Sequence, residues 1–231
     1  MQHRSALWRV VALVCTVAAI VPLPAGSAEN ARSELDAALR SVPNLDHGAE
    51  LFRNCAVCHG SNGQGTLDGG VARIAGQHVS VIAKQLVDYR HDRRWDIRME
   101  HFADRHHLPD PQSIMDIAGY VHSLSAEGPP GVGDGELAQH GSDLYFARCV
   151  GCHGPSGEGD AAKRIPRIAG QHYEYLMRQI YDAVDGRRAN FSRAHVRLFA
   201  KLDRDDIVGV ADFLSRLDSR PEPPASVAST R

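Results

Sequence analysis

Two short runs of cysteine and histidine are the part of this sequence best suited to chemistry. They read Cys55-Ala56-Val57-Cys58-His59 and Cys149-Val150-Gly151-Cys152-His153. Two cysteines about one helical turn apart can form thioether bonds to both vinyl groups of a porphyrin, and the histidine that follows can ligate the iron. The spacing therefore predicts two covalently bound c-type haems, with His59 and His153 as axial iron ligands.

Three other functions of such cysteine pairs fit the sequence less well. A redox-active pair of the thioredoxin kind needs neither the following histidine nor a second copy. A zinc site draws its ligands from clustered pairs, whereas these pairs are far apart in the chain. A disulfide within one pair would close too small a loop to stabilise a fold. The fifth cysteine, Cys15, lies in an N-terminal apolar run, so the mature chain has no spare cysteine.

The sequence contains one unit twice. The shift that carries Cys55 onto Cys149 also carries Arg73-Ile74-Ala75-Gly76-Gln77-His78 onto Arg167-Ile168-Ala169-Gly170-Gln171-His172. So much agreement in one register indicates duplication. The same shift pairs Gln85 with Gln179, Asp88 with Asp182, Arg93 with Arg187, Arg94 with Arg188, His101 with His195 and Leu108 with Leu202.

Helices must position these groups, because apolar residues recur at helical spacing in both copies. We expect an all-α fold of two tandem domains, each with three or four short helices wrapped around a haem. Domains of this size with few aromatic residues have a thin core and commonly need a cofactor. The segment between the copies is dense in Gly and Pro and marks a linker. The expected parts are domain one at 29–126, a linker at 127–136, domain two at 137–219 and a disordered tail at 220–231.

The N-terminus is typical of a secretory signal peptide over residues 1–28. Arg4 and Arg9 precede an apolar run at 10–21, and small residues follow up to Ala28. The run is shorter than the about 20 apolar residues that span a bilayer. We therefore expect a periplasmic protein without a membrane span after cleavage. The net charge of −2 becomes more negative when both arginines are removed, which argues against a nucleic-acid partner.

With these motifs the chain resembles a known family, the two-domain dihaem class I cytochromes c. The similarity is greatest to the cytochrome c4 type and to the related cytochrome subunits of sulfide-oxidising flavocytochromes. It covers nearly the whole mature chain. The motifs that carry it are Gly48-x-x-Leu51-x-x-x-Cys55, the run Ile74-Ala75-Gly76-Gln77 and the closing helix with Tyr120, each with a counterpart in the second copy.

The resemblance implies two packing features. A glycine of the first helix packs against an aromatic residue of the last, which here gives the pairs Gly48 with Tyr120 and Gly141 with Phe213. The carbonyl of a proline accepts a hydrogen bond from the proximal histidine. The second copy has Pro166 at that place, whereas the first has Ala72, whose carbonyl can accept the same bond from a less rigid backbone.

The sixth iron ligand departs from the methionine that the resemblance implies. In the second copy Met177 lies inside an expected helix, where a core role fits better, and Arg193 stands in register with Met99. His101 and His195 are in register with each other, and imidazole binds haem iron well. We predict His195 for the second haem and either His101 or Met99 for the first. The alternative is that both histidines lie on the surface.

Four arginines repeat as well: Arg93, Arg94, Arg187 and Arg188. A guanidinium suits a haem propionate, although solvated arginines need no such role, and of the four we predict that Arg93 and Arg187 bind the cofactor. His78 and His172 follow the Ala-Gly-Gln run at expected helix starts, where we expect a structural or propionate-side role.

Six-coordinate haems pass electrons rather than bind substrates. The leading hypothesis is a periplasmic electron carrier that transfers electrons between redox partner proteins such as an oxidase, a reductase or a flavoprotein. A second is an electron-transfer subunit of an oxidoreductase complex. A third is a haem enzyme, peroxidase-like or oxidising sulfur compounds, which would work at a haem with an open or labile sixth position.

The central prediction is that the mature protein carries two haems that denaturing solvent does not extract. Replacing both Cys149 and Cys152 by Ala should leave one haem, because the two attachment sites are separate. The pyridine haemochrome assay counts covalent haem per chain. A value of one or none in the unaltered protein would overturn the prediction.

Overall fold

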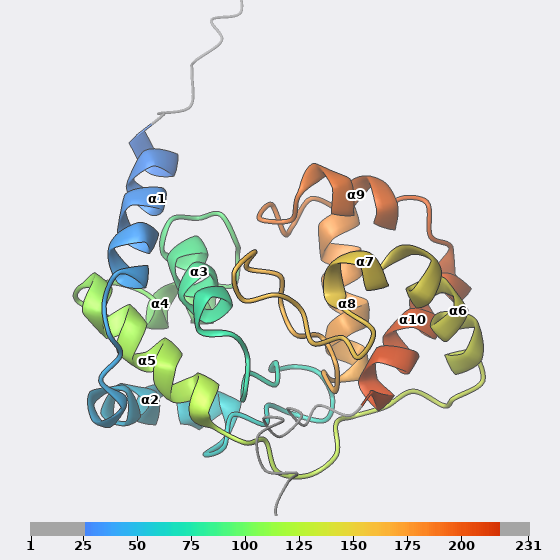
Figure 1. Cartoon of the computed structure of the whole chain (residues 1–231), viewed down its shortest axis with the longest axis horizontal. Helices are drawn as coiled ribbons and strands as arrows, with labels where there is room; N and C mark the ends of the chain where they lie inside the picture. Colours follow the sequence, from blue (N-terminus) through green and yellow to red (C-terminus); the bar gives the residue numbers. More distant parts are fainter. Residues whose placement is uncertain (1–25, 218–231) are drawn as a thin grey trace, which may run out of the picture.

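The computed structural model describes residues 26–217, which form two helical domains joined by an extended segment (Figure 1). The described residues contain no strand, and their only β-type pairing is an isolated bridge between Asp160 and Ile165. The expectation of an all-α fold in two tandem domains is confirmed. The disordered tail expected at 220–231 lies outside the described residues, as does the signal peptide except for its last three residues.

Each domain has five helices within the described residues, more than the three or four that the periodicity indicated. The additional ones, such as α4 and α7, are too short to show a period in the sequence. The helices of the first domain are α1 (Gly26–Leu39), α2 (Leu45–His59), α3 (Val79–Arg90), α4 (Ile97–Phe102) and α5 (Pro111–Ser123). Those of the second are α6 (Ala138–Arg148), α7 (Val150–His153), α8 (Tyr173–Val184), α9 (Arg193–Phe199) and α10 (Arg204–Arg216).

The first and last helices of each copy pack against each other and form its core. In the first domain α2 lies against α5, and the rings of Phe52 and Tyr120 are 5.4 Å apart. In the second, α6 lies against α10, and Tyr145 and Phe213 are 5.5 Å apart. Cys55 and Cys149, at the C-terminal parts of α2 and α6, pack against these two cores.

Glycines permit the close approach of these helices. A Cβ atom on Gly48 would lie 2.8 Å from Cβ of Tyr120 and closer still to the backbone of Asp116. The implied pairing of Gly48 with Tyr120 is thus present. Gly141 meets the backbone of Gly209 and Val210, so at this position helix α10 itself, rather than the ring of Phe213, requires the missing side chain.

Helix α1 was not predicted from the sequence and has no counterpart in the described part of the second domain. Its buried Glu34 accepts hydrogen bonds from Arg90 Nη1 at 2.5 Å and pairs with His91 Nε2 at 2.7 Å. Arg90 also donates to the carbonyls of Ala103 and Leu108. This network ties the end of α3 to the loop after α4, and so fixes the position of α4.

The segment between the domains is anchored along its length. The N–H of Gly131 donates to Nδ1 of His172, and the carbonyl of Gly131 accepts from the N–H of Tyr173. The N–H groups of Gly133 and Gly135 donate to the carboxylate of buried Asp212. The linker is therefore a fixed part of the fold. Among the described residues, no helix is both long and apolar enough to cross a bilayer.

The close contact at Gly141 gives a test of the packing. Gly141→Ala should lower the free energy of unfolding by about 2 kcal/mol, because overpacking of this kind forces two backbones apart. Gly151→Ala is the matched control, since no atom lies within 4 Å of its Cβ position and the first copy has Val57 there. Thermal unfolding of the haem-loaded protein measures both. Equal stability of the two variants would contradict the packing argument.

Candidate haem sites

The two attachment runs end helices α2 and α7 with buried histidines. His59 and His153 are each 9% exposed. Nδ1 of His59 lies 2.9 Å from the carbonyl oxygen of Ala72, and Nδ1 of His153 lies 3.1 Å from that of Pro166. Such a bond fixes the ring and leaves Nε2 for a metal. The carbonyl of Ala72 thus does what the proline carbonyl does in the second copy.

Burial also sets the charge of these imidazoles. It is the largest cause that lowers the pKa of His59, and the nearby charges of Arg98 and Arg94 lower it further. Burial likewise lowers the pKa of His153. Both rings are therefore neutral at ordinary pH, which is the form that ligates a metal.

The four cysteines of the runs are free thiols on the same helix ends. Cys58 and Cys152 are exposed, whereas Cys55 and Cys149 are half-buried against the domain cores. Burial, and secondarily the neighbouring Cys58, raises the pKa of Cys55 to about 11. One thiol of each pair thus lies on the core side and one on the open side.

His195 faces the proximal histidine of the second domain. The ring centres of His153 and His195 are 6.1 Å apart. Metal–imidazole bonds are about 2 Å long, so this separation accommodates an iron between two rings. Nδ1 of His195 lies 3.0 Å from Oγ of Ser192, which leaves Nε2 available. Burial, then Arg188, lowers the pKa of His195, so this ring too is neutral.

Matching the two domains by their helix caps gives a different correspondence of residues from the one that the sequence repeat gives. Asp96 caps α4 and Ser192 caps α9. Met99 and His195 are each the third residue after the cap, and each N–H donates to the capping side chain. Two more residues separate Arg188 from its cap than separate Arg94 from Asp96. The structural partner of His195 is therefore Met99, which packs against the first core.

His101 lies away from this position. Its side chain is 63% exposed, and its ring packs on Phe102 and on His107. One ligand atom each from His101, Asp104 and His107 lies within 4.8 Å of the other two. The structure therefore brings His153 and His195 together but does not bring His101 to His59. Met177 packs against the second core, as expected.

The predicted cofactor arginines, Arg93 and Arg187, are exposed and engaged by carboxylates. Arg93 Nε lies 3.6 Å from Asp88, and Arg187 donates to Asp182 at 2.8 Å. Their neighbours Arg94 and Arg188 are the inward-facing pair. The sequence shows the two arginine pairs but not which member of each pair points inward. That direction depends on the backbone conformation just after helices α3 and α8, which the sequence pattern does not give.

Arg94 and Arg188 lie in a polar network between the domains. Arg94 donates to Gln85 at 2.7 Å, to the Tyr175 hydroxyl at 2.6 Å and to Gln179 at 2.8 Å. Arg188 donates to Gln179 at 2.7 Å and to Asn190. Burial, then the charge of Arg94, lowers the pKa of Arg188 to about 10.

The direct hydrogen-bond partners are neutral, but the carboxylate of Asp88 also acts on Arg94 and that of Asp182 on Arg188. Two guanidinium groups close to each other in a largely buried network are costly unless anions compensate them. Haem carboxylates would add to the compensation that these two aspartates give, so this part of the site is compatible with the cofactor.

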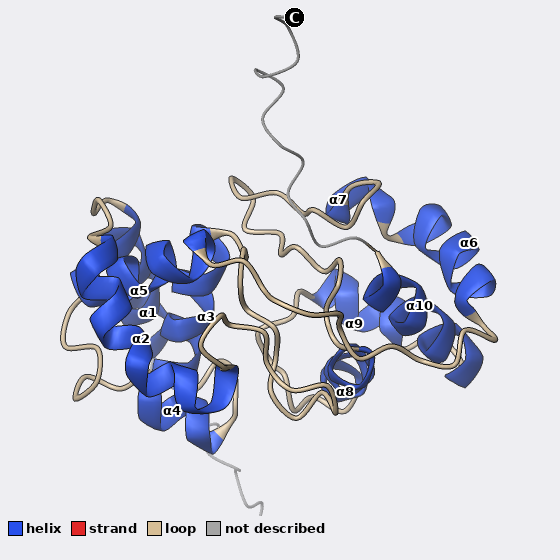
Figure 2. Cartoon of the chain, turned by 90° about the horizontal axis from the view of Figure 1, so that it is seen from below, coloured by secondary structure: helices blue, strands red, loops and turns tan. Residues whose placement is uncertain are grey.

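The repeated Gln and His residues reach across the interface, a role that sequence analysis missed. Gln77 brackets Arg167: its Oε1 accepts the N–H at 2.9 Å and its Nε2 donates to the carbonyl at 2.8 Å. Gln171 makes the same two bonds to Arg73: its Oε1 accepts the N–H at 3.0 Å and its Nε2 donates to the carbonyl at 2.8 Å. The loops that carry these residues face each other between the two sets of helices (Figure 2). Their exact repetition in both copies was the signal that could have revealed the role.

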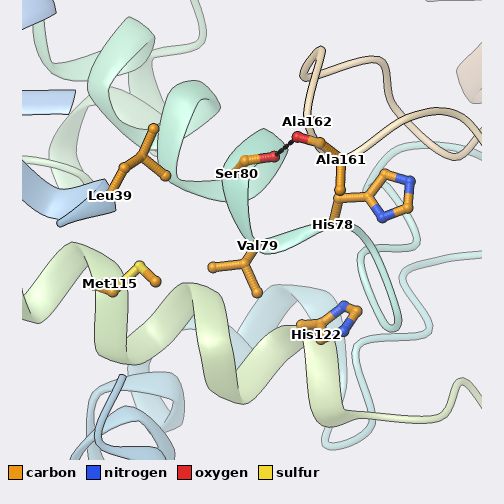
Figure 3. A pocket seen from close by; sticks show the side chains of 8 residues that line it. All are labelled: Leu39, His78, Val79, Ser80, Met115, His122, Ala161 and Ala162. Atoms are coloured by element: carbon orange, nitrogen blue, oxygen red, sulfur yellow. Dashed lines mark hydrogen bonds between the residues drawn. The ribbon is translucent and has the colours of Figure 1, made fainter. Parts of the chain in front are cut away.

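The two histidines of the repeated run continue this exchange. Nε2 of His78 lies 2.8 Å from the carbonyl oxygen of Glu158, and Nε2 of His172 lies 2.7 Å from that of Gln64. Beside His78, Ser80 donates to the carbonyl of Ala161 at 2.6 Å, at the edge of a cavity of about 350 Å³ between the domains (Figure 3). The two copies are therefore docked by reciprocal bonds, and His78 and His172 have the structural role.

Two helical domains, each with a Cys-x-x-Cys-His run and a buried, carbonyl-bonded histidine, define a c-type haem protein. Residues 45–125 and 138–218 each match the family model of cytochrome c. The chain therefore belongs to the cytochrome c family. It holds two haem c groups, one at each cysteine pair, and its function is electron transfer.

Relatives share the two-domain arrangement. Cytochrome c4 of Thiocapsa roseopersicina is 32% identical over 174 residues, which cover 71% of this chain and 86% of that protein. The crystal structure of reduced cytochrome c4 from Pseudomonas stutzeri is 25% identical with a TM-score of 0.67, over 77% of this chain and 100% of that one. A thiosulfate dehydrogenase from Marichromatium purpuratum is 27% identical with a TM-score of 0.66, over 81% of this chain and 44% of that one.

Proposed function

We propose that this cytochrome is a periplasmic electron carrier whose two haems differ in their sixth ligand. The second haem takes His153 and His195, and the first takes His59 and Met99. The observation that carries the proposal is the 6.1 Å separation of the His153 and His195 rings, together with the neutral state of both.

Met99 is supported by its place in the helix. It is the third residue of a capped helix, as His195 is, and it packs against the core to which Cys55 also belongs. The charges of Arg98 and Asp96 act on His59, so the start of α4 lies beside the first proximal histidine. His101, on the other side of α4, is largely exposed.

The two ligand sets imply two different reduction potentials. Haem c supplies a one-electron couple, and methionine ligation raises its potential relative to histidine ligation. The first site should thus be the stronger electron acceptor, and electrons received in the second domain pass towards the first. The protein contributes a fixed separation of the sites, because reciprocal hydrogen bonds dock the domains.

Arg94 and Arg188 take the propionate-side role that Arg93 and Arg187 had in the sequence interpretation. They point into the interface, and their direct hydrogen-bond partners are neutral. Asp88 and Asp182 compensate part of their charge, and haem carboxylates would compensate more of it. Positive charge near a haem also favours the reduced iron, so both arginines contribute to the potentials.

Export rests on the signal peptide at 1–28, and the partners are redox proteins. The similarity to a thiosulfate dehydrogenase favours, as a second candidate, an electron-transfer subunit working with an enzyme that oxidises a sulfur compound. Co-purification of the exported protein with such an enzyme distinguishes the subunit from the free carrier. Carbon monoxide binding by the unaltered reduced protein would instead indicate a haem enzyme with a labile sixth position.

Ligand variants test the proposed haems directly. His195→Ala should convert the second haem to a high-spin form that binds carbon monoxide when reduced, because its sixth position becomes open. Met99→Ala should do the same to the first haem. His101→Ala is the matched control and should leave both haems low-spin. Absorption spectra of the oxidised and reduced variants give the answer; a low-spin second haem in His195→Ala would refute the assignment.

A further inference from the structure

The residues that dock the domains also contact the loops that hold the iron ligands. Gln171 brackets Arg73, and the residue before Arg73 is Ala72, whose carbonyl accepts the hydrogen bond of His59. Gln77 brackets Arg167, which follows Pro166, the acceptor for His153. The N–H that each glutamine accepts and the carbonyl that orients the proximal histidine of the opposite domain belong to one peptide group, so each glutamine holds that peptide group directly.

This arrangement connects docking to the chemistry of the iron. A hydrogen bond from Nδ1–H to a carbonyl raises the basicity of an imidazole ligand and fixes its orientation. More basic ligands stabilise the oxidised iron and lower the potential. A shift of the accepting carbonyl therefore changes the potential, and the position of that carbonyl depends on a side chain from the other domain.

We propose that Gln77 and Gln171 are positioning residues, each of which couples the docking of its own domain to the iron site of the other. The inference rests on the proposed function, in that both sites carry electron-transferring haems. The potential of each haem then responds to whether the domains are docked, so a partner that alters the interface alters both potentials.

The coupling is unequal, because the two loops differ in stiffness. Proline fixes its own φ angle, so Pro166 keeps its carbonyl in place with less outside support. Ala72 has no such restriction and depends more on Gln171. The first haem therefore responds more strongly to the loss of its glutamine than the second haem does.

The test compares Gln171→Ala and Gln77→Ala in the haem-loaded protein by spectroelectrochemistry and by the hyperfine-shifted NMR signals of each oxidised haem. In Gln171→Ala the potential of the first haem should rise and its signals should shift. Gln77→Ala should affect the second haem in the same direction by a smaller amount.

Two further variants separate this role from a merely structural one. Ser80→Ala removes an interdomain hydrogen bond that is remote from both proximal carbonyls, and it should leave both haem spectra unchanged. Gln171 also accepts the N–H of His172. Gln171→Glu keeps that acceptor and loses the donor to Arg73, but it adds a negative charge, so the comparison uses the NMR signals of the first haem, which should still shift, and not its potential.

Equal shifts in Ser80→Ala and Gln171→Ala would overturn the inference, as would unshifted signals in Gln171→Ala. Either result leaves the proposed function intact, provided that two haems are bound and that His195→Ala opens the second one.

An independent observation concerns the loop after α4, where His101, Asp104 and His107 lie. Asp104 Oδ1 is held by the N–H groups of His106 and His107, and Nδ1 of His107 lies 3.0 Å from the same oxygen. The Nδ1 atom of His101 lies 3.9 Å from Asp104 Oδ2. The second domain has a shorter connection between α9 and α10 and no such cluster.

Two imidazoles and a carboxylate form a common ligand set for divalent transition metals. We infer that His101, Asp104 and His107 bind a divalent transition-metal ion such as Zn²⁺. The ion would complete a site that the loop backbone has already arranged.

Calorimetric titration of the haem-loaded protein with Zn²⁺ tests this site. His107→Ala and His101→Ala should each weaken binding at least about tenfold. His140→Ala is the matched control, because His140 pairs with Asp206 at 2.7 Å on the exposed surface without a second histidine; it should bind as the unaltered protein does. Equal affinities in all variants, or no binding, would refute the site.

Discussion

The hydrogen bond from each proximal histidine to a loop carbonyl is the constraint on which the rest of this structure depends. The histidine must be buried, neutral and fixed in orientation to serve as an iron ligand. Its carbonyl partner belongs to a loop without regular structure, which a few hydrogen bonds within its own domain hold, such as those from Ile74 to Gly63 and from Ile168 to Gly157. The opposite domain adds further support, through Gln171 on one side and Gln77 on the other. Docking and iron ligation are therefore parts of one network.

The interface explains why the duplicated unit is used as a pair. Arg94 and Arg188 are buried among neutral hydrogen-bond partners contributed by both domains, at a considerable desolvation cost. A single domain would expose these groups and the loop carbonyls to water. Two docked copies largely bury them together, beside the carboxylates of Asp88 and Asp182. Burial, and secondarily the charge of Arg188, lowers the pKa of His195.

Duplication produced similar domains that differ in the segment between the third and the last helix of the repeat. The two α-helices that carry Met99 and His195 begin with equivalent caps, but the chain before α9 is two residues longer, and the loop after α4 is longer than that after α9. The longer segment before α9 is offset by the shorter loop after it, so the motifs on either side stay at the same spacing in the two copies. The residues of α4 and α9 between them are shifted relative to each other. For this reason the pairing of His101 with His195 looked sound in the sequence and does not exist in the fold.

The sequence alone determined the haem attachment residues, the duplication and the all-α class, because covalent attachment depends on local spacing and helices on a local period. It also singled out His195 as the proposed sixth ligand of the second haem. It did not determine α1, the inward arginines or the role of Gln77 and Gln171. Those features depend on contacts between segments far apart in the chain, and only the tertiary structure decides which face of a loop or short helix meets the other domain.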